Sequence, residues 1–152
     1  MKITILAVGR LARSAETDLV KLYVERATSA GRALGLGPVE VIEVESRKPG
    51  KTAEAEALTP YLADAHVIAC DEHGQARASR VFAEEIGRLR DDGVRRLVYV
   101  IGGADGLDPS LSGDETLALG VQTWPHALAR AMMAEQIYRA ATILAGSPYH
   151  RD

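Results

Sequence analysis

The sequence predicts an α/β protein in which a parallel sheet is flanked by helices. Short apolar runs alternate with amphipathic stretches of helical spacing along the 152 residues. Parallel strands require crossover connections, and helices between successive strands are the usual form of these. The length, with 47% of residues hydrophobic, suits one compact domain, which is expected over residues 1–152.

Four strands are expected in the first two thirds of the chain. Each is an apolar run of strand length that ends at charged or turn-forming residues. The expected strands cover residues 2–8, 38–44, 66–70 and 96–101.

Helices are expected between and after these strands. Ser14, Thr52 and Ser79 have hydroxyls that can cap a first turn, so each is expected to precede a helix. The second and third helices are expected over 53–63 and 80–91, and the last from Pro125 to about Ala145. The residues expected to pack into the core are Leu19, Leu22, Tyr23 and Ala27, then Val81, Phe82, Ile86 and Leu89, then Met133, Ile137, Ala140 and Leu144.

The composition restricts the compartment and the partners. Cys70 is the only cysteine, so no disulfide is expected and a reducing cytoplasm is predicted. The amino-terminal apolar run is too short for a signal peptide, and no run approaches the length of a membrane span. The formal net charge of -3 argues against general affinity for nucleic acid. Local basic clusters at 47–51, at Arg77 with Arg80, and at 150–151 leave a restricted contact with RNA open.

A glycine-rich loop follows the last expected strand. Gly102, Gly103 and Gly106 lie where open α/β sheets bind ligands, and glycine lets the backbone approach a ligand closely. The spacing is G-G-x-x-G, which differs from the G-x-G-x-x-G fingerprint of dinucleotide sites. Taken alone, the loop therefore predicts either a ligand site or a plain tight turn.

Two further segments can carry chemistry. Trp124, the only tryptophan, can fill the core or stack on a flat ligand such as adenine. Glu135 and Arg139 have the spacing of an intrahelical ion pair, which explains Arg139 without a functional role. Residues 147–152 place an aromatic, an imidazole and a guanidinium on a chain end, where such side chains are usually solvated.

The order of these segments resembles the RlmH-type ribosomal RNA methyltransferases of the SPOUT superfamily. The matching motifs are residues 102–106, 123–126, 135–140 and 148–151, with 2–9, 47–51 and 71–75 upstream, so that the resemblance covers essentially the whole chain. It implies a C-terminal trefoil knot, a homodimer, and transfer of a methyl group from S-adenosylmethionine. The implied acceptor is N3 of a pseudouridine in large-subunit (23S) ribosomal RNA, on the assembled ribosome.

Carried over position by position, the resemblance implies a methyl-donor site on three loops. Its residues would be Cys70, Gly102, Gly103, Leu119, Gly120, Val121, Gln122, Thr123 and Trp124. Two positions depart from the family pattern, because Cys70 stands where leucine is common and Trp124 where phenylalanine or leucine is usual. Both replacements are apolar, so packing on adenine is expected to persist in altered shape.

The implied reaction needs a group that removes the N3 proton. His150 is the expected base, with His126 second, because imidazole titrates near neutrality. Arg139 or Arg151 would stabilise the developing anion or hold a phosphate, and Tyr149 would stack on the base. No metal is expected, since the four histidines show no ligand spacing and a sulfonium needs no Lewis acid. The tail of one subunit could complete the donor pocket of the other.

Three alternatives remain open. A nucleotide-binding oxidoreductase would use the glycine loop for a nicotinamide cofactor. A non-catalytic ribosome-assembly factor would keep the fold without turnover. A SPOUT methyltransferase acting on another RNA, such as tRNA, would use the same chemistry.

Overall fold

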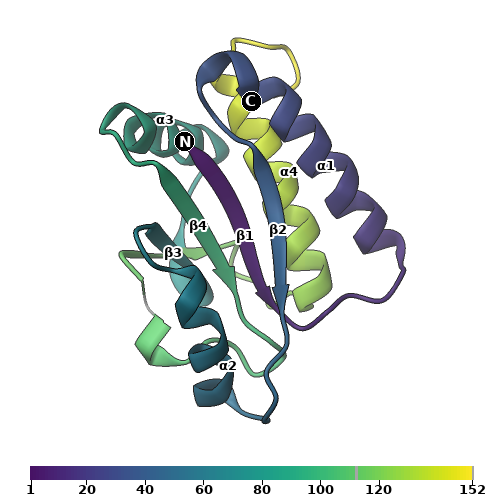
Figure 1. Cartoon of the computed structure of the whole chain (residues 1–152). Helices are drawn as coiled ribbons and strands as arrows, with labels where there is room; N and C mark the ends of the chain where they lie inside the picture. The colour runs from purple at the N-terminus through teal and green to yellow at the C-terminus, as the bar shows by residue number, and fades with distance from the viewer. Residues whose placement is uncertain (112, 152) are drawn as a thin grey trace.

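A parallel sheet forms the centre of the molecule in the computed structural model, which describes residues 1–111 and 113–151 (Figure 1). Within these residues the sheet has five strands in the order β2-β1-β4-β3-β5. They are β1 (Lys2–Val8), β2 (Val39–Val44), β3 (His66–Ala76), β4 (Arg96–Ile101) and β5 (Glu115–Ala118). Every pairing between them is parallel, so the carboxyl ends of the strands meet at one edge. The predicted class, a parallel sheet flanked by helices, is confirmed.

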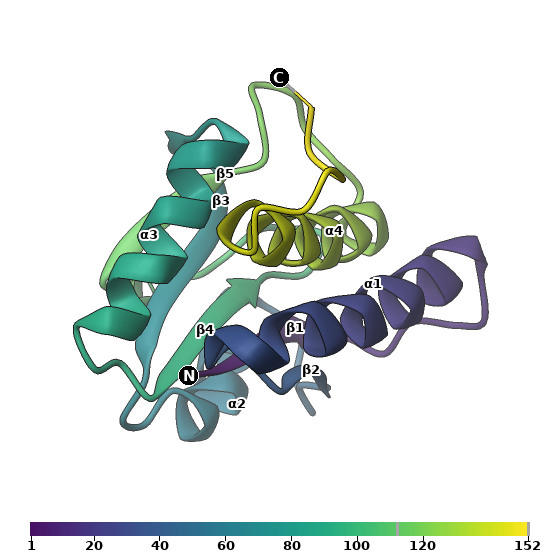
Figure 2. The same ribbon diagram turned by 90° about the horizontal axis from the view of Figure 1, so that it is seen from above.

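Helices cover both faces of the sheet unequally. They are α1 (Ala15–Gly31), α2 (Lys51–Leu58), α3 (Ser79–Asp91) and α4 (His126–Leu144). The helices α1, α3 and α4 pack on one face and α2 packs on the other, as Figure 2 shows. Along β1 the side chains alternate accordingly, with Ile3 and Ile5 facing the first layer and Leu6 facing α2.

The helix starts agree with the sequence prediction at one of three capping residues. The hydroxyl of Ser14 accepts a hydrogen bond from the first turn of α1, as expected. Thr52 lies inside α2 and donates to Asp108 Oδ2 at 3.1 Å, and Ser79 is the first residue of α3 and donates to Gln136 Oε1 at 2.9 Å. The predicted caps at Thr52 and Ser79 are therefore wrong, because both hydroxyls bond to distant elements.

Several element boundaries differ from the prediction. The helix expected over 53–63 ends at Leu58 and continues as a 3-10 turn, Thr59–Tyr61. The strand expected over 66–70 extends to Ala76, and β5 was not predicted because four residues carry too little pattern. The last helix follows Pro125 and ends beside Gly146, as predicted.

Three residues expected in the core are exposed. Leu19 and Leu22 lie on the outer flank of α1, and Val81 of α3 is 51% exposed. The buried residues of α1 include Ala27, as predicted, and Val20, which the prediction did not include.

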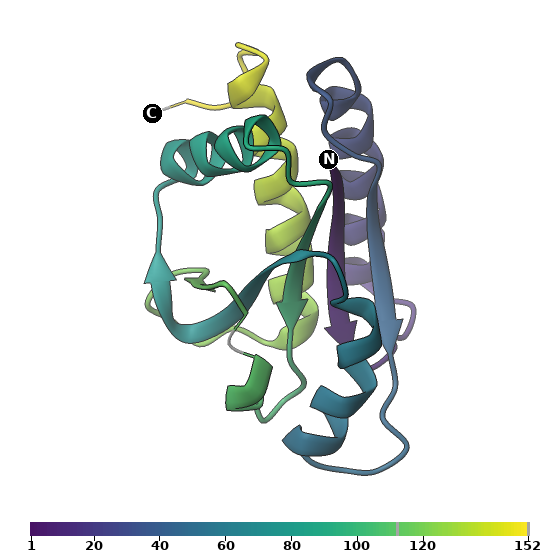
Figure 3. The same ribbon diagram turned by 60° about the vertical axis from the view of Figure 1, so that its left-hand side comes forward.

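The strand β3 leaves the sheet beyond its midpoint. It pairs with β4 only as far as Cys70 and then bends away, as Figure 3 shows. Cys70 and Gln75 both pair with Leu117 of β5, so residues 71–74 form a bulge between them. A Cβ at Gly74 would lie 2.7 Å from the carbonyl carbon of Leu117, which explains the glycine there. The bulge projects at the carboxyl edge of the sheet.

None of the helices in the described part of the chain has both the length and the apolar character needed to cross a membrane.

Candidate functional site

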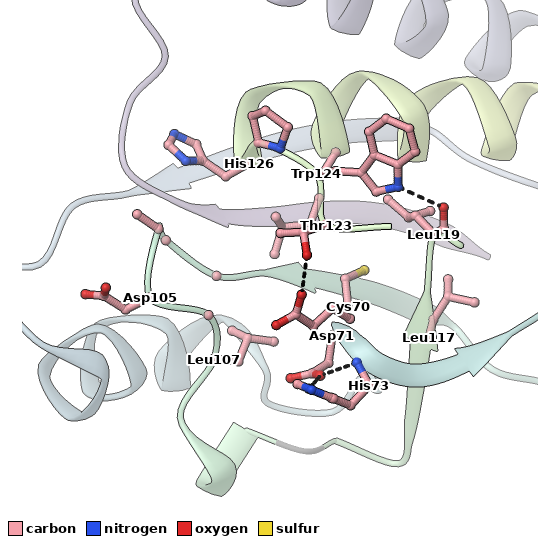
Figure 4. Close-up of a pocket in the computed structure, with 18 of the residues that line it drawn as sticks. Cys70, Asp71, His73, Asp105, Leu107, Leu117, Leu119, Thr123, Trp124 and His126 are labelled. Atoms are coloured by element: carbon pink, nitrogen blue, oxygen red, sulfur yellow. Dashed lines mark hydrogen bonds and ion pairs between the residues drawn. The ribbon is translucent and has the colours of Figure 1, made fainter. Parts of the chain in front are cut away.

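A cavity of about 610 Å³ opens at the carboxyl edge of the sheet (Figure 4). Its walls come from the bulge of β3, from the glycine loop after β4, and from the segment between β5 and α4. Open parallel sheets bind ligands in this position, outside the carboxyl ends of the strands. The cavity is therefore the first candidate for a functional site.

The glycine loop folds tightly back on itself. Gly103 and Gly106 form an isolated antiparallel bridge, with the N–H of Gly106 donating to the carbonyl of Gly103 at 3.1 Å. A Cβ at Gly102 would lie 2.7 Å from the carbonyl carbon of Gly106, so no larger residue fits. Gly106 also has φ +82°, a conformation that favours glycine. Backbone groups thus form this wall of the cavity.

The segment between β5 and α4 is tied to the bulge by one side chain and is held in shape by another. Thr123 donates to Glu72 Oε2 of the bulge at 2.8 Å, which joins two walls of the cavity. The indole N–H of Trp124 donates to the carbonyl of Leu119 at 3.2 Å. The indole lies at the cavity and is 38% exposed (Figure 4), so Trp124 does not fill the core.

Acidic side chains gather around the cavity. Asp71 and Glu72 come from the bulge and Asp105 from the glycine loop, while Lys51 of α2 brings a positive charge. Asp71 Oδ1 accepts a hydrogen bond from the backbone N–H of His73 at 2.8 Å and contacts its Nδ1 at 3.2 Å. Carboxylates in a partly enclosed site favour a ligand with cationic groups.

Cys70 lies where β3 meets the cavity. Burial raises the pKa of its thiol to about 12. The thiol is therefore neutral at physiological pH and contributes an apolar surface rather than a nucleophile.

We expect native Cys70 to resist alkylation. The ordinary thiol pKa is about 8.5, so between that value and pH 12 the unfolded chain releases the thiol proton while the native chain keeps it, and the free energy of unfolding falls progressively as the pH rises through this range. Iodoacetamide at pH 8.5, followed by mass spectrometry, should label the urea-unfolded chain at least about tenfold faster than the native chain. Equal labelling rates would contradict the assignment.

Most residues predicted for the methyl-donor site line the cavity. These are Cys70, Gly102, Gly103, Leu119, Gly120, Gln122, Thr123 and Trp124. Val121 is the exception, because its side chain is 92% exposed and does not contribute to the lining. Its side chain therefore forms no part of the cavity wall, and its place in the donor site stays a prediction.

The sequence prediction missed part of the lining. Asp71, Glu72 and His73 belong to the bulge, and Leu107 and Leu117 add apolar surface. The bulge could have been found, because residues 71–75 follow a predicted strand at the edge where the glycine loop lies. Leu117 could not, because β5 was not recognised.

The chain end is packed rather than frayed. The ring of Tyr149 packs against that of Tyr138 of α4, with centroids 4.6 Å apart and planes tilted by 57°, and its hydroxyl donates to Glu135 Oε1 at 2.9 Å. Arg139 lies over the Tyr149 ring and contacts His150 Nδ1 at 3.2 Å, and it forms the predicted ion pair with Glu135. Burial and the hydrogen bond to Glu135 raise the pKa of Tyr149. The expectation of a solvated tail is wrong for Tyr149 and His150, while Arg151 is exposed.

The tail cluster, defined as Glu135, Arg139, Tyr149 and His150, does not reach the cavity of its own chain. None of its members lines the cavity, whereas His126 and Ala129 at the start of α4 do. Nine to thirteen residues along α4 separate His126 from Glu135 and Arg139, about 14–20 Å at the rise of an α-helix. The structure thus brings three of the four predicted catalytic residues together, Arg139, Tyr149 and His150, but away from the predicted donor site.

A buried arginine that the sequence analysis did not consider supports the first turns of α4. Arg130 is fully buried, donates to the carbonyl of Val8 at the end of β1, and pairs with Glu43 Oε1 at 2.9 Å. Glu43 Oε1 also accepts from the backbone N–H of Leu11 at 3.0 Å. Arginine is usually exposed unless it is paired, and helical periodicity does not show a partner in another element. That periodicity alone therefore assigns Arg130 to the surface. The pair ties α4 to the carboxyl edge of the sheet.

One member of the predicted cluster of Arg77 and Arg80 is internal, whereas Arg80 is exposed. Arg77 pairs with Glu85 at 2.5 Å and with Glu115 at 2.6 Å, and 9% of its side chain is exposed. Its charge is neutralised within the fold, so its proposed part in a surface patch is wrong. Arg47 and Lys48 are exposed, and Lys51 lies at the cavity.

Similarity to proteins in named families extends over nearly the whole chain. A family described as predicted SPOUT methyltransferase matches residues 1–150. A protein of Phenylobacterium zucineum, named ribosomal RNA large subunit methyltransferase H, is 78% identical over 154 aligned positions that cover 100% of both chains. Proteins of the same name from Caulobacter sp. (strain K31) and Caulobacter vibrioides are 70% and 68% identical. Both alignments cover 100% of this chain, and they cover 100% and 99% of the two relatives respectively.

Solved structures share the fold at low sequence identity. A probable methyltransferase from Bordetella pertussis Tohama I superposes with a TM-score of 0.54 at 17% identity, covering 92% of this chain and 96% of that chain. A probable methylase family protein from Haemophilus influenzae gives 0.51 at 14% identity, covering 95% and 66%. The family match, the close relatives and the shared fold agree, and the chain belongs to the SPOUT methyltransferase family.

Proposed function

We propose that the protein transfers the methyl group of S-adenosylmethionine to N3 of a pseudouridine in large-subunit ribosomal RNA, on the assembled ribosome. The observation that carries the proposal is the cavity at the carboxyl edge of the sheet, with its folded glycine loop and acidic rim. The names of the close relatives support the class of RNA. The resemblance of the tail motif supports the nucleotide.

The residues of the cavity fit the proposed donor. Cys70, Leu117 and Leu119 offer apolar surface to the adenine, and the bare backbone at Gly102 allows close approach. Asp71 suits the positive charges of the sulfonium and the amino group. When bound, the donor supplies an electrophilic methyl group, and the chain's own residues bind and orient it.

The tail cluster fits the acceptor side of the reaction. A bond forms between N3 and the methyl carbon while the carbon–sulfur bond breaks and its electron pair leaves with sulfur; the N3 proton passes to a base. The guanidinium of Arg139 can only donate hydrogen bonds. The ring nitrogen of His150 that it contacts, Nδ1, is therefore the nitrogen that carries the lone pair. That nitrogen accepts the proton once the nucleobase replaces Arg139, which can then stabilise the anion. Tyr149, kept neutral by its raised pKa, can stack on the base.

A homodimer reconciles the two separated groups of residues. In one chain the tail cluster contacts the middle of α4, whereas the cavity lies at its first turn. We therefore place the tail of one subunit against the cavity of the other. Each active site would then contain a donor pocket and a tail from different chains.

The proposal is tested by methyl transfer from labelled S-adenosylmethionine to intact ribosomes, to stripped ribosomal RNA and to tRNA. Mass spectrometry of the products should place the label on a large-subunit pseudouridine of intact ribosomes. Label on tRNA alone would move the activity to another RNA. No label on any substrate would leave a non-catalytic ribosome-assembly role as the better explanation.

Two inactive variants should complement each other if the tail acts on the partner subunit. Gly102→Ala damages the donor pocket and His150→Ala removes the proposed base, so each alone is expected to lose most activity. Equal mixing should restore about a quarter of the wild-type sites, because half the dimers are mixed and each has one intact site. Methyl transfer after subunit exchange measures this.

The control for complementation is the chain that carries both substitutions, mixed with either single variant. Such mixtures contain no dimer with an intact composite site and should stay inactive. If the two single variants also remain inactive together, while each binds the partner normally, the tail acts within its own chain.

A further inference from the structure

A second cavity of about 560 Å³ lies between α3, α4 and the end of β5. It shares Leu117, Leu119 and Gly120 with the first cavity, so the two are separated by one segment of chain. The rest of its lining is Ala76, Arg77, Ala78, Ser79, Phe82, Ala118, Met132, Glu135 and Gln136. Nothing in the donor site accounts for it.

We infer that this second cavity binds the pyrimidine base of the acceptor nucleotide, and that Gln136 recognises the N1–H and O2 edge that distinguishes pseudouridine from uridine. The inference rests on the proposed function and assigns its acceptor site: the base lies in the second cavity of the subunit that binds the donor, and the tail that meets it there is the partner's. Four features of the second cavity support it.

The first feature is its position. Methyl transfer requires the attacking nitrogen within about 3–3.5 Å of the methyl carbon, so acceptor and donor sites must adjoin. The wall between the cavities includes Gly120, which has no side chain and has φ +117°. A base in the second cavity can therefore turn its N3 edge toward the donor at this glycine, while Leu117 and Leu119 contribute the rest of the shared wall.

The second feature is the apolar surface. Phe82, Met132 and Leu117 line the cavity, and Phe82 also packs on Tyr99 in the core, which holds its ring in place. A nucleobase has two apolar faces and a polar edge, so it suits a site with apolar walls and few oriented polar groups.

The third feature is the neutral charge of the polar lining. The guanidinium of Arg77 is paired with Glu85 and Glu115, and the carboxylate of Glu135 is paired with Arg139. Neither is left to attract a phosphate or a charged side chain. The site thus matches an uncharged uracil-type ring better than an ion.

The fourth feature is an oriented carboxamide. Gln136 Nε2 lies 2.9 Å from Glu135 Oε2, and a carboxylate paired with arginine only accepts, so the amide nitrogen must face it. Ser79 donates to Gln136 Oε1 at 2.9 Å. These contacts use one N–H and one lone pair, and a second N–H and a second lone pair remain.

The free donor and acceptor of Gln136 complement one edge of pseudouridine. In this nucleoside the ribose is attached to C5, so N1 carries a hydrogen beside the O2 carbonyl. An amide can accept from N1–H and donate to O2 while N3 stays free to react. In uridine N1 bears the ribose and cannot donate. These two hydrogen bonds therefore distinguish pseudouridine from uridine, although both nucleosides contain the same pyrimidine ring.

The test compares ribosomes that carry pseudouridine at the target position with ribosomes that carry uridine there, prepared from cells without the corresponding pseudouridine synthase. Wild-type protein should methylate the pseudouridine form with the higher kcat/KM. Gln136→Met keeps the side-chain volume and the helix but removes the amide. The ratio of kcat/KM for pseudouridine ribosomes to kcat/KM for uridine ribosomes should therefore fall about tenfold. The affinity for S-adenosylmethionine, measured by calorimetry, should not change.

Two further variants support the interpretation. Ser79→Ala removes one of the two bonds that orient the amide and should lower the ratio by a smaller factor. Arg88→Met is the control, because Arg88 is exposed on α3 and lines neither cavity. It should leave the ratio at the wild-type value.

The outcomes separate this inference from the proposed function. A wild-type protein that methylates neither kind of ribosome would contradict the proposed function itself. An active wild type that does not prefer pseudouridine, or a Gln136→Met protein that keeps the wild-type ratio, would overturn the assignment of the second cavity. Dissociation of the dimer by Gln136→Met, seen by sedimentation, would instead identify the cavity as part of the subunit contact and would also overturn it.

Discussion

Gly102→Ala is expected to weaken binding of S-adenosylmethionine about 10- to 100-fold. The added Cβ would lie 2.7 Å from the carbonyl carbon of Gly106 and 3.0 Å from the backbone nitrogen of Leu107, and backbone cannot rotate aside as a side chain can. The glycine loop must therefore move, at a cost of about 1–3 kcal/mol, and it forms one wall of the cavity. Isothermal titration calorimetry with S-adenosylmethionine measures the effect.

Gly31→Ala provides a matched control for this experiment. Its Cβ would lie 2.6 Å from the backbone oxygen of Leu36, so the clash is as severe as at Gly102. Gly31 ends α1 and does not line the cavity. We expect a similar loss of stability with unchanged affinity for the donor. Equal loss of affinity in both variants would show that destabilisation, rather than the shape of the glycine loop, governs binding.

Glu43→Ala is expected to lower the free energy of unfolding by about 3–5 kcal/mol, because it leaves the buried guanidinium of Arg130 without a counter-charge. Burial already lowers the pKa of Arg130, and Glu43 opposes this effect. For a chain of this size the loss corresponds to a fall in Tm of roughly 6–20 °C. Urea unfolding followed by circular dichroism measures it.

A double-mutant cycle separates the ion pair from packing. Arg130→Met fills much of the same space without a charge, so the chain with both substitutions should be more stable than Glu43→Ala alone. Arg130→Met alone should cost less than Glu43→Ala, because Glu43 is partly exposed and can be solvated. If the double variant lost as much unfolding free energy as the two single variants together, Glu43 would stabilise the fold through Leu11 rather than through Arg130.

Apolar runs in the sequence predicted most of the strands, because a buried strand consists largely of apolar residues. The strands β1 and β4 are buried on both faces and appear in the sequence as nearly continuous apolar runs, close to their observed bounds. The strand β2 lies at the sheet margin, is only partly buried and contains two glutamates, but its apolar residues were sufficient to predict it. The end of β3 and all of β5 lie at the sheet margin, and they are specified by the bulge and by partner strands distant in sequence. No periodicity could reveal them. The trefoil knot follows from family membership, since apolar patterns contain no information about threading.

The candidate site was predictable where it depends on the ends of parallel strands. The glycine loop and the segment before α4 were found for that reason, and Trp124 lies at the cavity, where its contact with a ligand remains a prediction. Arg130 and Gln136 could not be found, because their significance comes from partners in other elements, Glu43 and Ser79. The packing of Tyr149 on Tyr138 was missed because a chain end has no downstream pattern.

The hydrogen bond between Thr123 and Glu72 has a consequence for the exchange of donor and product. It spans the mouth of the cavity between a segment that leads into α4 and a bulge that leaves the sheet, and both residues are exposed. A single bond of this kind contributes about 1.5–3 kcal/mol, less than the stability of a domain. Breaking this bond leaves every strand pairing of the sheet in place, so exchange of a ligand at the cavity does not require the sheet to loosen.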